Sequence, residues 1–182
     1  STPVIAPSGS ITGGSAQATG QTSISQTLTN TTSAPATATY TVTPRSGTCN
    51  GSSFTVTVTV NPTPVLNSGL TPADVCSNTT FTYTPTSLTT GTTFSWTRLG
   101  AAGITTTEPA TGTDGISQVL RNFTSETIPV TYEYLLTANG CTNTRQVVVN
   151  IKPEPVIADQ SASVCSGEAL THHILLDNFD NP

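Results

Sequence analysis

The chain has 182 residues and a net charge of −5, and only 8% of its residues are charged. Its single lysine is Lys152, and no basic stripe or basic helix offers contacts to phosphates, so the composition excludes nucleic acid as a partner. No run of 18 apolar residues exists that could insert into a membrane.

Threonine supplies 40 of the residues, and this β-branched side chain suits a pleated, half-solvated surface. In chain order, apolar residues first alternate at Ala38, Tyr40 and Val42. The clearest strand is 54–60, with apolar residues on one face and threonines on the other. Further segments of period two are 81–83, 94–98, 116–120, 130–136 and 145–151. Asn139-Gly140 supplies the positive φ of a hairpin turn between the last two.

About seven short strands in 90 residues, without a convincing helix, predict an all-β fold. The pattern is typical of immunoglobulin-like antiparallel β-sandwich domains placed end to end. Trp96 lies where such a fold buries an aromatic side chain. The residues predicted to form the core are Trp96, Tyr132, Tyr134, Val147, Val149, Phe54, Val56 and Val58.

The sequence repeats itself with a period near 90 residues, which is the size of a whole small domain. Ile24-Ser25-Gln26 returns as Ile116-Ser117-Gln118, and Val75-Cys76-Ser77 returns as Val164-Cys165-Ser166. Residues 1–62 are therefore expected to be the C-terminal part of a first repeat. Residues 63–153 are expected to be a complete repeat, and residues 154–182 the N-terminal part of a third.

The spacing of the repeats suggests a longer array. If a second copy followed head to tail, 66 residues would separate Cys165 from the next Cys49, close to the 65 between Cys76 and Cys141. We expect the chain to be a two-domain window on such an array. Arbitrary truncation is the alternative.

Four cysteines at positions that follow the repeat predict disulfides formed in an oxidising compartment, rather than a zinc site. The repeat favours Cys76–Cys141, and Cys165 paired with Cys49 of the following copy. The rival pairing is Cys49–Cys76 with Cys141–Cys165, across the domain junctions.

Proline pairs mark the predicted junctions between domains. They are Pro62 with Pro64, and Pro153 with Pro155. Because proline fixes φ and favours extended backbone, these segments are predicted to be short, semi-rigid linkers that hold successive domains in line.

The sequence offers no constellation of an enzyme, such as a nucleophile with its base, paired carboxylates or a metal site. We therefore expect no catalytic residue, no metal and no cofactor.

Several motifs together resemble the PKD-like, immunoglobulin-type repeats of giant Bacteroidetes surface proteins. They are Ser-Ile-Ser-Gln-Thr-Leu-Thr-Asn at 23–30, Tyr-Thr-Val-Thr-Pro at 40–44, the segment 54–64 and Val-Cys-Ser. The resemblance covers nearly all of the chain and implies β-sandwich modules of secreted or cell-surface proteins, some of them adhesins. Trp96 is followed by Thr97-Arg98-Leu99 instead of the acidic PKD motif, so no role of those acidic residues is carried over.

Two functions follow as expectations. The first is a non-enzymatic stalk or filament module of a long extracellular protein, whose partners are neighbouring repeats placed head to tail. The second is a carbohydrate-binding accessory module that recognises a surface glycan, which calls for exposed aromatic side chains. Buried Trp96, Tyr132 and Tyr134 would favour the first. A filament could also form by strand exchange, with residues 156–177 of one subunit completing the sheet of residues 1–62 in the next.

Overall fold

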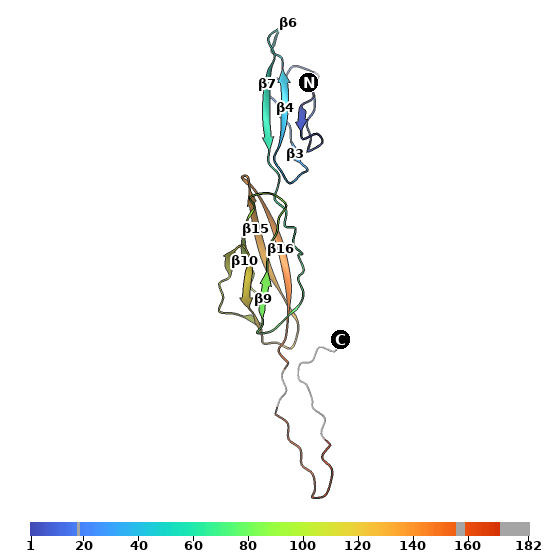
Figure 1. Ribbon diagram of the computed structural model, residues 1–182, viewed down its shortest axis with the longest axis vertical. Helices are drawn as coiled ribbons and strands as arrows, with labels where there is room; N and C mark the ends of the chain where they lie inside the picture. Colours follow the sequence, from blue (N-terminus) through green and yellow to red (C-terminus); the bar gives the residue numbers. More distant parts are fainter. Residues whose placement is uncertain (18, 156–158, 172–182) are drawn as a thin grey trace. The chain divides into compact units, whose positions relative to one another are not determined.

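The computed structural model describes residues 1–17, 19–155 and 159–171 (Figure 1). The chain divides into two compact units. The first holds Ser1–Ser68 with Thr86–Phe94 and Leu135–Thr144, and the second holds Gly69–Pro85, Ser95–Tyr134 and Arg145–Pro182. Every element in the described residues is a β-strand, which confirms the predicted all-β class.

Seven strands lie in residues 1–62. They are β1 (Val4–Ala6), β2 (Ile11–Thr12), β3 (Thr29–Asn30), β4 (Ala36–Val42), β5 (Arg45–Ser46), β6 (Cys49–Asn50) and β7 (Phe54–Val60). The main sheet has the order β1-β4-β7, and both of its pairings are antiparallel. The strand pairs β2-β3 and β5-β6 are separate two-stranded ladders.

The pairing of β4 with β7 shows how alternation in the sequence becomes two faces of a sheet. Val42 lies opposite Phe54, and Ala36 lies opposite Val60, so apolar residues share one face along the whole ladder. Threonines share the other face, where the hydroxyls of Thr39 and Thr57 are 3.1 Å apart and hydrogen bonded. Cross-strand pairs of this kind stabilise a solvated sheet face.

Nine strands follow. They are β8 (Val75–Cys76), β9 (Thr80–Tyr83), β10 (Thr93–Arg98), β11 (Ile104–Thr105), β12 (Thr111–Thr113), β13 (Ile116–Val119), β14 (Arg121–Asn122), β15 (Ile128–Ala138) and β16 (Cys141–Lys152). A five-stranded sheet has the order β12-β10-β15-β16-β8, and β13 pairs with β9 in a second, antiparallel layer. The ladder β11-β14 is also antiparallel.

Aromatic side chains join the two layers of this second repeat. The ring of Phe81 on β9 lies 5.6 Å from that of Tyr132 on β15, and the same distance separates Tyr83 from Tyr134. Trp96 on β10 packs edge-on against Tyr132 at an interplanar angle of 74°. Tilted and edge-to-face packing are favourable geometries for aromatic rings.

The hairpin between β15 and β16 turns at Asn139 and Gly140, whose φ angles are 50° and 79°. This confirms the predicted turn, since two successive residues of positive φ give the primed turns that match strand twist. Val65 and Leu66 belong to no strand. Leu66 nevertheless lies in the core, with 7% of its surface exposed.

The close packing of Trp96 on Gly112 gives a testable prediction. The two residues are paired across β10 and β12, and a Cβ at Gly112 would lie within 2.7 Å of Trp96 Cε2. We expect Gly112→Ala to lower the free energy of unfolding by about 1–3 kcal/mol, because the indole must move. Urea unfolding followed by tryptophan fluorescence measures this. Gly100→Ala, where an added Cβ meets open space, is the matched control, and an equal loss in both variants would contradict the prediction.

Candidate functional site

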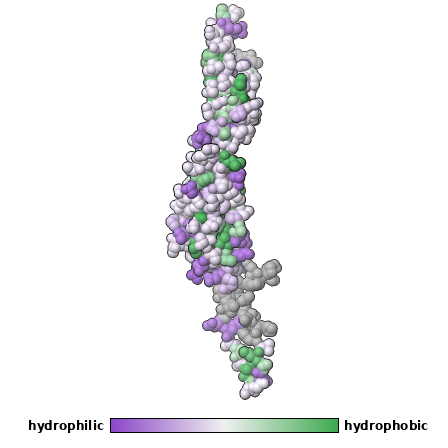
Figure 2. Space-filling view, viewed as in Figure 1, coloured by the Kyte–Doolittle hydropathy of each residue, from purple (hydrophilic) through white to green (hydrophobic). Residues whose placement is uncertain are grey.

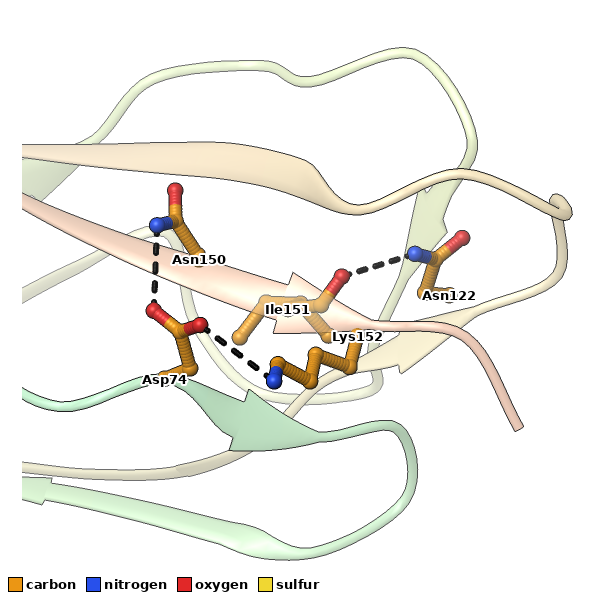
Figure 3. A network of polar contacts seen from close by, with 5 residues as sticks. All are labelled: Asp74, Asn122, Asn150, Ile151 and Lys152. Atoms are coloured by element: carbon orange, nitrogen blue, oxygen red, sulfur yellow. Dashed lines mark hydrogen bonds and ion pairs between the residues drawn. The ribbon is translucent and has the colours of Figure 1, made fainter. Parts of the chain in front are cut away.

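The repeated motif Ile-Ser-Gln-x-Leu-x-Asn positions a buried amide in the second repeat. Asn122 has 2% of its surface exposed, and its Nδ2 donates to the carbonyl oxygens of Glu126 at 2.7 Å and Ile151 at 2.8 Å. Its Oδ1 accepts hydrogen bonds from the backbone N and the hydroxyl of Thr124. One side chain thus ties β14, the following loop and the end of β16 together (Figure 3).

The first repeat builds the same node from Asn30. Its Nδ2 donates to the carbonyl oxygens of Ala34 at 2.8 Å and Val60 at 2.7 Å, and its Oδ1 accepts from the N and hydroxyl of Thr32. The repeat in sequence is therefore a repeat of individual hydrogen bonds. The nodes differ in one respect: Ser77, which bonds the backbone N of Asn122 at 2.9 Å, has no counterpart among residues 1–62.

Polar contacts also fix the end of β16 to the segment that leads into β8. The carboxylate of Asp74 accepts a hydrogen bond from Asn150 Nδ2 at 3.0 Å and lies 3.6 Å from Lys152 Nζ (Figure 3). Next to them, Cys76 pairs with Lys152 in a parallel ladder. The ion pair is about half exposed, so its own contribution is under about 1 kcal/mol.

A second buried amide, Gln118, lies beside the aromatic core. Its Oε1 accepts hydrogen bonds from the hydroxyl of Tyr132 at 2.8 Å and from Arg98 Nη1, and its Nε2 donates to Pro109 O at 2.7 Å. Burial raises the pKa of Tyr132 to about 12, although the Arg98 guanidinium opposes part of the rise. Burial also raises the pKa of Tyr134. Both hydroxyls are therefore held neutral.

The predicted core residues are buried in the second repeat and more exposed in the first. Trp96 is 7% exposed, and Tyr132, Tyr134, Val147 and Val149 are fully buried. The prediction needs correction for the first repeat. Phe54 is 53% exposed and Val58 is 38% exposed, while Val56 is half-buried.

The difference lies in the second layer, which is less complete over the described part of residues 1–62. Ile11, Ala36, Ala38 and Tyr40 form a buried cluster there, but no ladder like that of β9 and β13 accompanies it. In the second repeat, strand β9 covers the sheet by pairing with Ile116–Val119. The equivalent residues of the first repeat, Ile24–Thr27, belong to no strand. Ile24 is 44% exposed, whereas its counterpart Ile116 is 3% exposed.

The predicted disulfide within a repeat also needs correction. All four cysteines lie in described residues and carry free thiols. Cys76 lies beside Lys152, at the opposite end of β16 from Cys141. Eleven residues of extended strand span about 36 Å, whereas a disulfide requires Cα atoms less than about 7 Å apart. The pairing of Cys165 with Cys49 of a following copy stays a prediction.

The proline segment after β7 is packed rather than exposed. Pro62 and Pro64 are fully buried, and the carbonyl oxygen of Pro64 accepts a hydrogen bond from Asn143 Nδ2 at 2.8 Å. Asn61 Nδ2 donates to Asn139 O at 2.7 Å. All of these residues belong to the first unit. At the second proline segment, Pro153 is buried and Pro155 is exposed.

Some apolar side chains of residues 1–62 are exposed beside the buried cluster, and we call them the open face. Figure 2 shows green, apolar surface on this part of the chain. The open face consists of the exposed side chains of Ile24, Phe54 and Val58, whereas Leu28, Val56 and Val60 are half-buried and pack against the buried cluster. The sequence predicted that residues 1–62 are only part of a repeat, but it wrongly placed Phe54 and Val58 in the core, because the alternation of 54–60 reveals an inward face and not what covers it.

The described residues show few other features of a ligand-binding or catalytic site. They contain no group of three metal-ligating side chains and no helix long and apolar enough to cross a membrane. A half-open depression of about 260 Å³ lies in the second unit, lined by Arg98, Leu99, Ile104 and Val130 among others. The open face is therefore the candidate functional surface.

The largely antiparallel sheets, packed in two layers in the second repeat, are those of an immunoglobulin-like β-sandwich protein. The PKD-like domain model matches residues 2–64 and again residues 73–155, and the chain belongs to the PKD-like domain family. Domains of this family are typically extracellular structural modules and are generally non-catalytic. No curated protein and no solved structure matches the chain.

The two asparagine nodes predict unequal effects of the same substitution. Asn122→Asp replaces a donor of two hydrogen bonds by an acceptor that faces two carbonyl oxygens in a fully buried position. We expect it to lower the free energy of unfolding by about 2–5 kcal/mol. Asn30 bonds the equivalent groups of the first repeat but is only partly buried. We therefore expect Asn30→Asp to lower the free energy of unfolding by less. Urea unfolding of both variants at pH 7 checks this, and a larger loss for Asn30→Asp would contradict it.

The raised tyrosine pKa values predict alkaline instability. Tyrosines of the unfolded chain titrate near pH 10, so the folded protein holds the Tyr132 proton more tightly. The resulting stability is complete below pH 10 and is lost as pH rises from 10 to about 12, by at most about 1.4 kcal/mol per pH unit for each tyrosine.

Urea unfolding between pH 8 and pH 12, with reductant present, measures this slope. We expect Tyr132→Phe to be less stable at pH 8, because the bond to Gln118 is lost, and to show a shallower decline above pH 10. Parallel curves for the two proteins would rule out titration of Tyr132 as the cause.

Proposed function

We propose that the chain is a structural repeat of a long extracellular protein, a stalk or filament module that holds other regions away from the cell surface. Its role is to supply length and resistance to unfolding. Neighbouring repeats of the same protein, placed head to tail, are its partners.

The observation that carries the proposal is that most aromatic side chains are buried in the core. Sugar recognition needs aromatic rings at the surface, but the single tryptophan and all four tyrosines are buried in the two repeats. Phe81 and Trp96 both pack against Tyr132, and the contact of Phe81 with Tyr132 joins the layers of the second repeat. These rings act as structural supports rather than as a binding platform.

The packed proline segment supports the same role. A spacer must resist bending where one repeat follows another, and two amide side chains bond backbone carbonyl oxygens there, from Asn61 to Asn139 and from Asn143 to Pro64. Each such bond contributes about 1 kcal/mol. A flexible glycine-serine segment would offer no comparable contacts.

Among the described residues, the exposed aromatics that a carbohydrate-binding module could use are Phe54 and Phe123, which are 53% and 63% exposed. They belong to different units and to different repeats. Nothing in the described residues arranges them as a stacking row. The spacer role therefore accounts better for the positions of the aromatic residues.

A glycan-binding measurement tests the proposal. The chain is immobilised and exposed to an array of bacterial and plant polysaccharides, with Phe54→Ala and Phe123→Ala as matched variants. We expect no saturable binding by any of the three proteins. Saturable binding that either substitution abolishes would overturn the spacer role in favour of a carbohydrate module.

A further inference from the structure

The depression in the second unit, of about 260 Å³, is formed by the end of β10, the loop that follows it and one residue of β15. Among the residues that line it, Arg98 alone is charged. Most of the wall is apolar and consists of Leu99, Ala101, Ile104, Ala110 and Val130. A mostly apolar hollow with a single polar anchor is the usual form of a small-molecule site, and this volume limits the ligand to a small one.

Backbone hydrogen bonds hold the walls of the depression in place. The N of Arg98 donates to Ala110 O at 2.7 Å, and the N of Ile104 donates to Ala101 O at 3.2 Å. Strand β11, which contains Ile104, is also paired with β14. A ligand therefore does not have to order this part of the chain, which lowers the entropy cost of binding.

The positive charge of Arg98 has no counter-ion in the described residues. Its Nη1 donates to Gln118 Oε1 and Pro109 O, and its Nη2 donates to Glu108 O at 3.3 Å, so all of its acceptors are neutral. No carboxylate of the described chain forms an ion pair with it. Because a guanidinium has five N–H donors, at least two of them, including that of Nε, have no partner there. Partly buried charges are normally paired.

The first repeat shows that the network around Arg98 does not require a charge. There Tyr40 donates its hydroxyl to Gln26 Oε1 at 2.8 Å, as the equivalent tyrosine and glutamine do in the second repeat. The backbone of Ser15 completes the network, because its N donates to Gln26 Oε1 at 3.1 Å and its O accepts from Gln26 Nε2 at 2.7 Å. A neutral backbone group thus performs the structural task of Arg98.

We propose that the depression binds a small carboxylate with a short aliphatic tail. The carboxylate accepts hydrogen bonds from the unpartnered N–H groups of Arg98, and the tail contacts Leu99, Ile104 and Val130. Charge-assisted bonds from a guanidinium to a carboxylate are short and strong, and its planar fork suits two parallel bonds. Removal of the apolar tail from water adds to the affinity. This inference goes beyond the spacer role, which holds whether or not the depression is occupied.

The lining favours a carboxylate over a phosphate. A phosphate carries more negative charge and more oxygen atoms that need donors. The depression offers it one cation, Arg98, and a wall that is otherwise mostly apolar. Oxygen atoms buried without donors cost free energy. A single carboxylate with an apolar tail matches both the charge and the wall.

A ligand series tests the proposal without any substitution. The isotopically labelled chain is titrated with isovalerate up to about 20 mM at low salt, and its amide NMR signals are followed. We expect saturable shifts confined to residues 98–110 and their neighbours on β15, with a Kd on the order of 1 mM. Isovaleramide has the same shape without the charge, and acetate has the charge without the tail. Each should bind at least about tenfold more weakly.

Two leucine variants test the location. Gly100 lines the depression, and a Cβ added there would meet open space, so Gly100→Leu fills the hollow without disturbing the packing. We expect it to abolish the isovalerate shifts. Gly69→Leu, which also adds a side chain in open space but lies outside the depression, should bind like the unmodified chain.

The variant Arg98→Gln tests the anchor. It should bind isovalerate and isovaleramide equally weakly. Because Arg98 also bonds Gln118, the fold of this variant is checked by tryptophan fluorescence. If the variant does not fold, the ligand series and Gly100→Leu decide the question.

N-acetyl-leucine distinguishes two sources of the carboxylate. It carries the same charged group and a similar tail on a peptide-like unit. Tighter binding than that of isovalerate would identify a peptide C-terminus as the source, and weaker binding would identify a free acid. Both results keep the site.

The absence of saturable shifts, equal affinity for isovalerate and isovaleramide, or binding that persists in Gly100→Leu would each overturn the proposal. None of these outcomes affects the spacer role. Conversely, saturable glycan binding that Phe54→Ala or Phe123→Ala abolishes would remove the spacer role and leave the carboxylate site in place.

Discussion

The covering of one sheet face by a second layer is the constraint on which the rest of the structure depends. A β-sandwich is stable only where the inward side chains of both sheets are removed from water. In the second repeat, β9 and β13 supply that layer, and Val147, Val149 and Ile151 of β16 are fully buried. In residues 1–62 the corresponding layer is incomplete, so the same positions of the repeat are exposed.

Amide side chains, rather than charges, hold the strands in register. Asn122 and Asn30 each bond two backbone carbonyl oxygens and one threonine, and Gln118 connects Tyr132, Arg98 and Pro109. Neutral amides satisfy buried backbone groups without the desolvation cost of an ion. A chain in which only 8% of residues are charged therefore still specifies its pairing.

The sequence predicted individual strands and turns well. It predicted poorly which strands pair and which side chains another layer covers. Alternation located β7, β15 and β16, and Asn139-Gly140 located the hairpin turn, because these depend on neighbouring residues alone. Exposure of Phe54 and separation of Cys76 from Cys141 depend on which strand pairs with which, and spacing carries no such information. The asparagine nodes were visible as a repeated motif, but their role as strand ties required the hydrogen bonds.

The contacts from Asn61 to Asn139 and from Asn143 to Pro64 have a consequence for evolution. Each joins a side-chain amide to a backbone carbonyl oxygen, a group that every residue possesses. The accepting position can therefore change its side chain freely without loss of the bond.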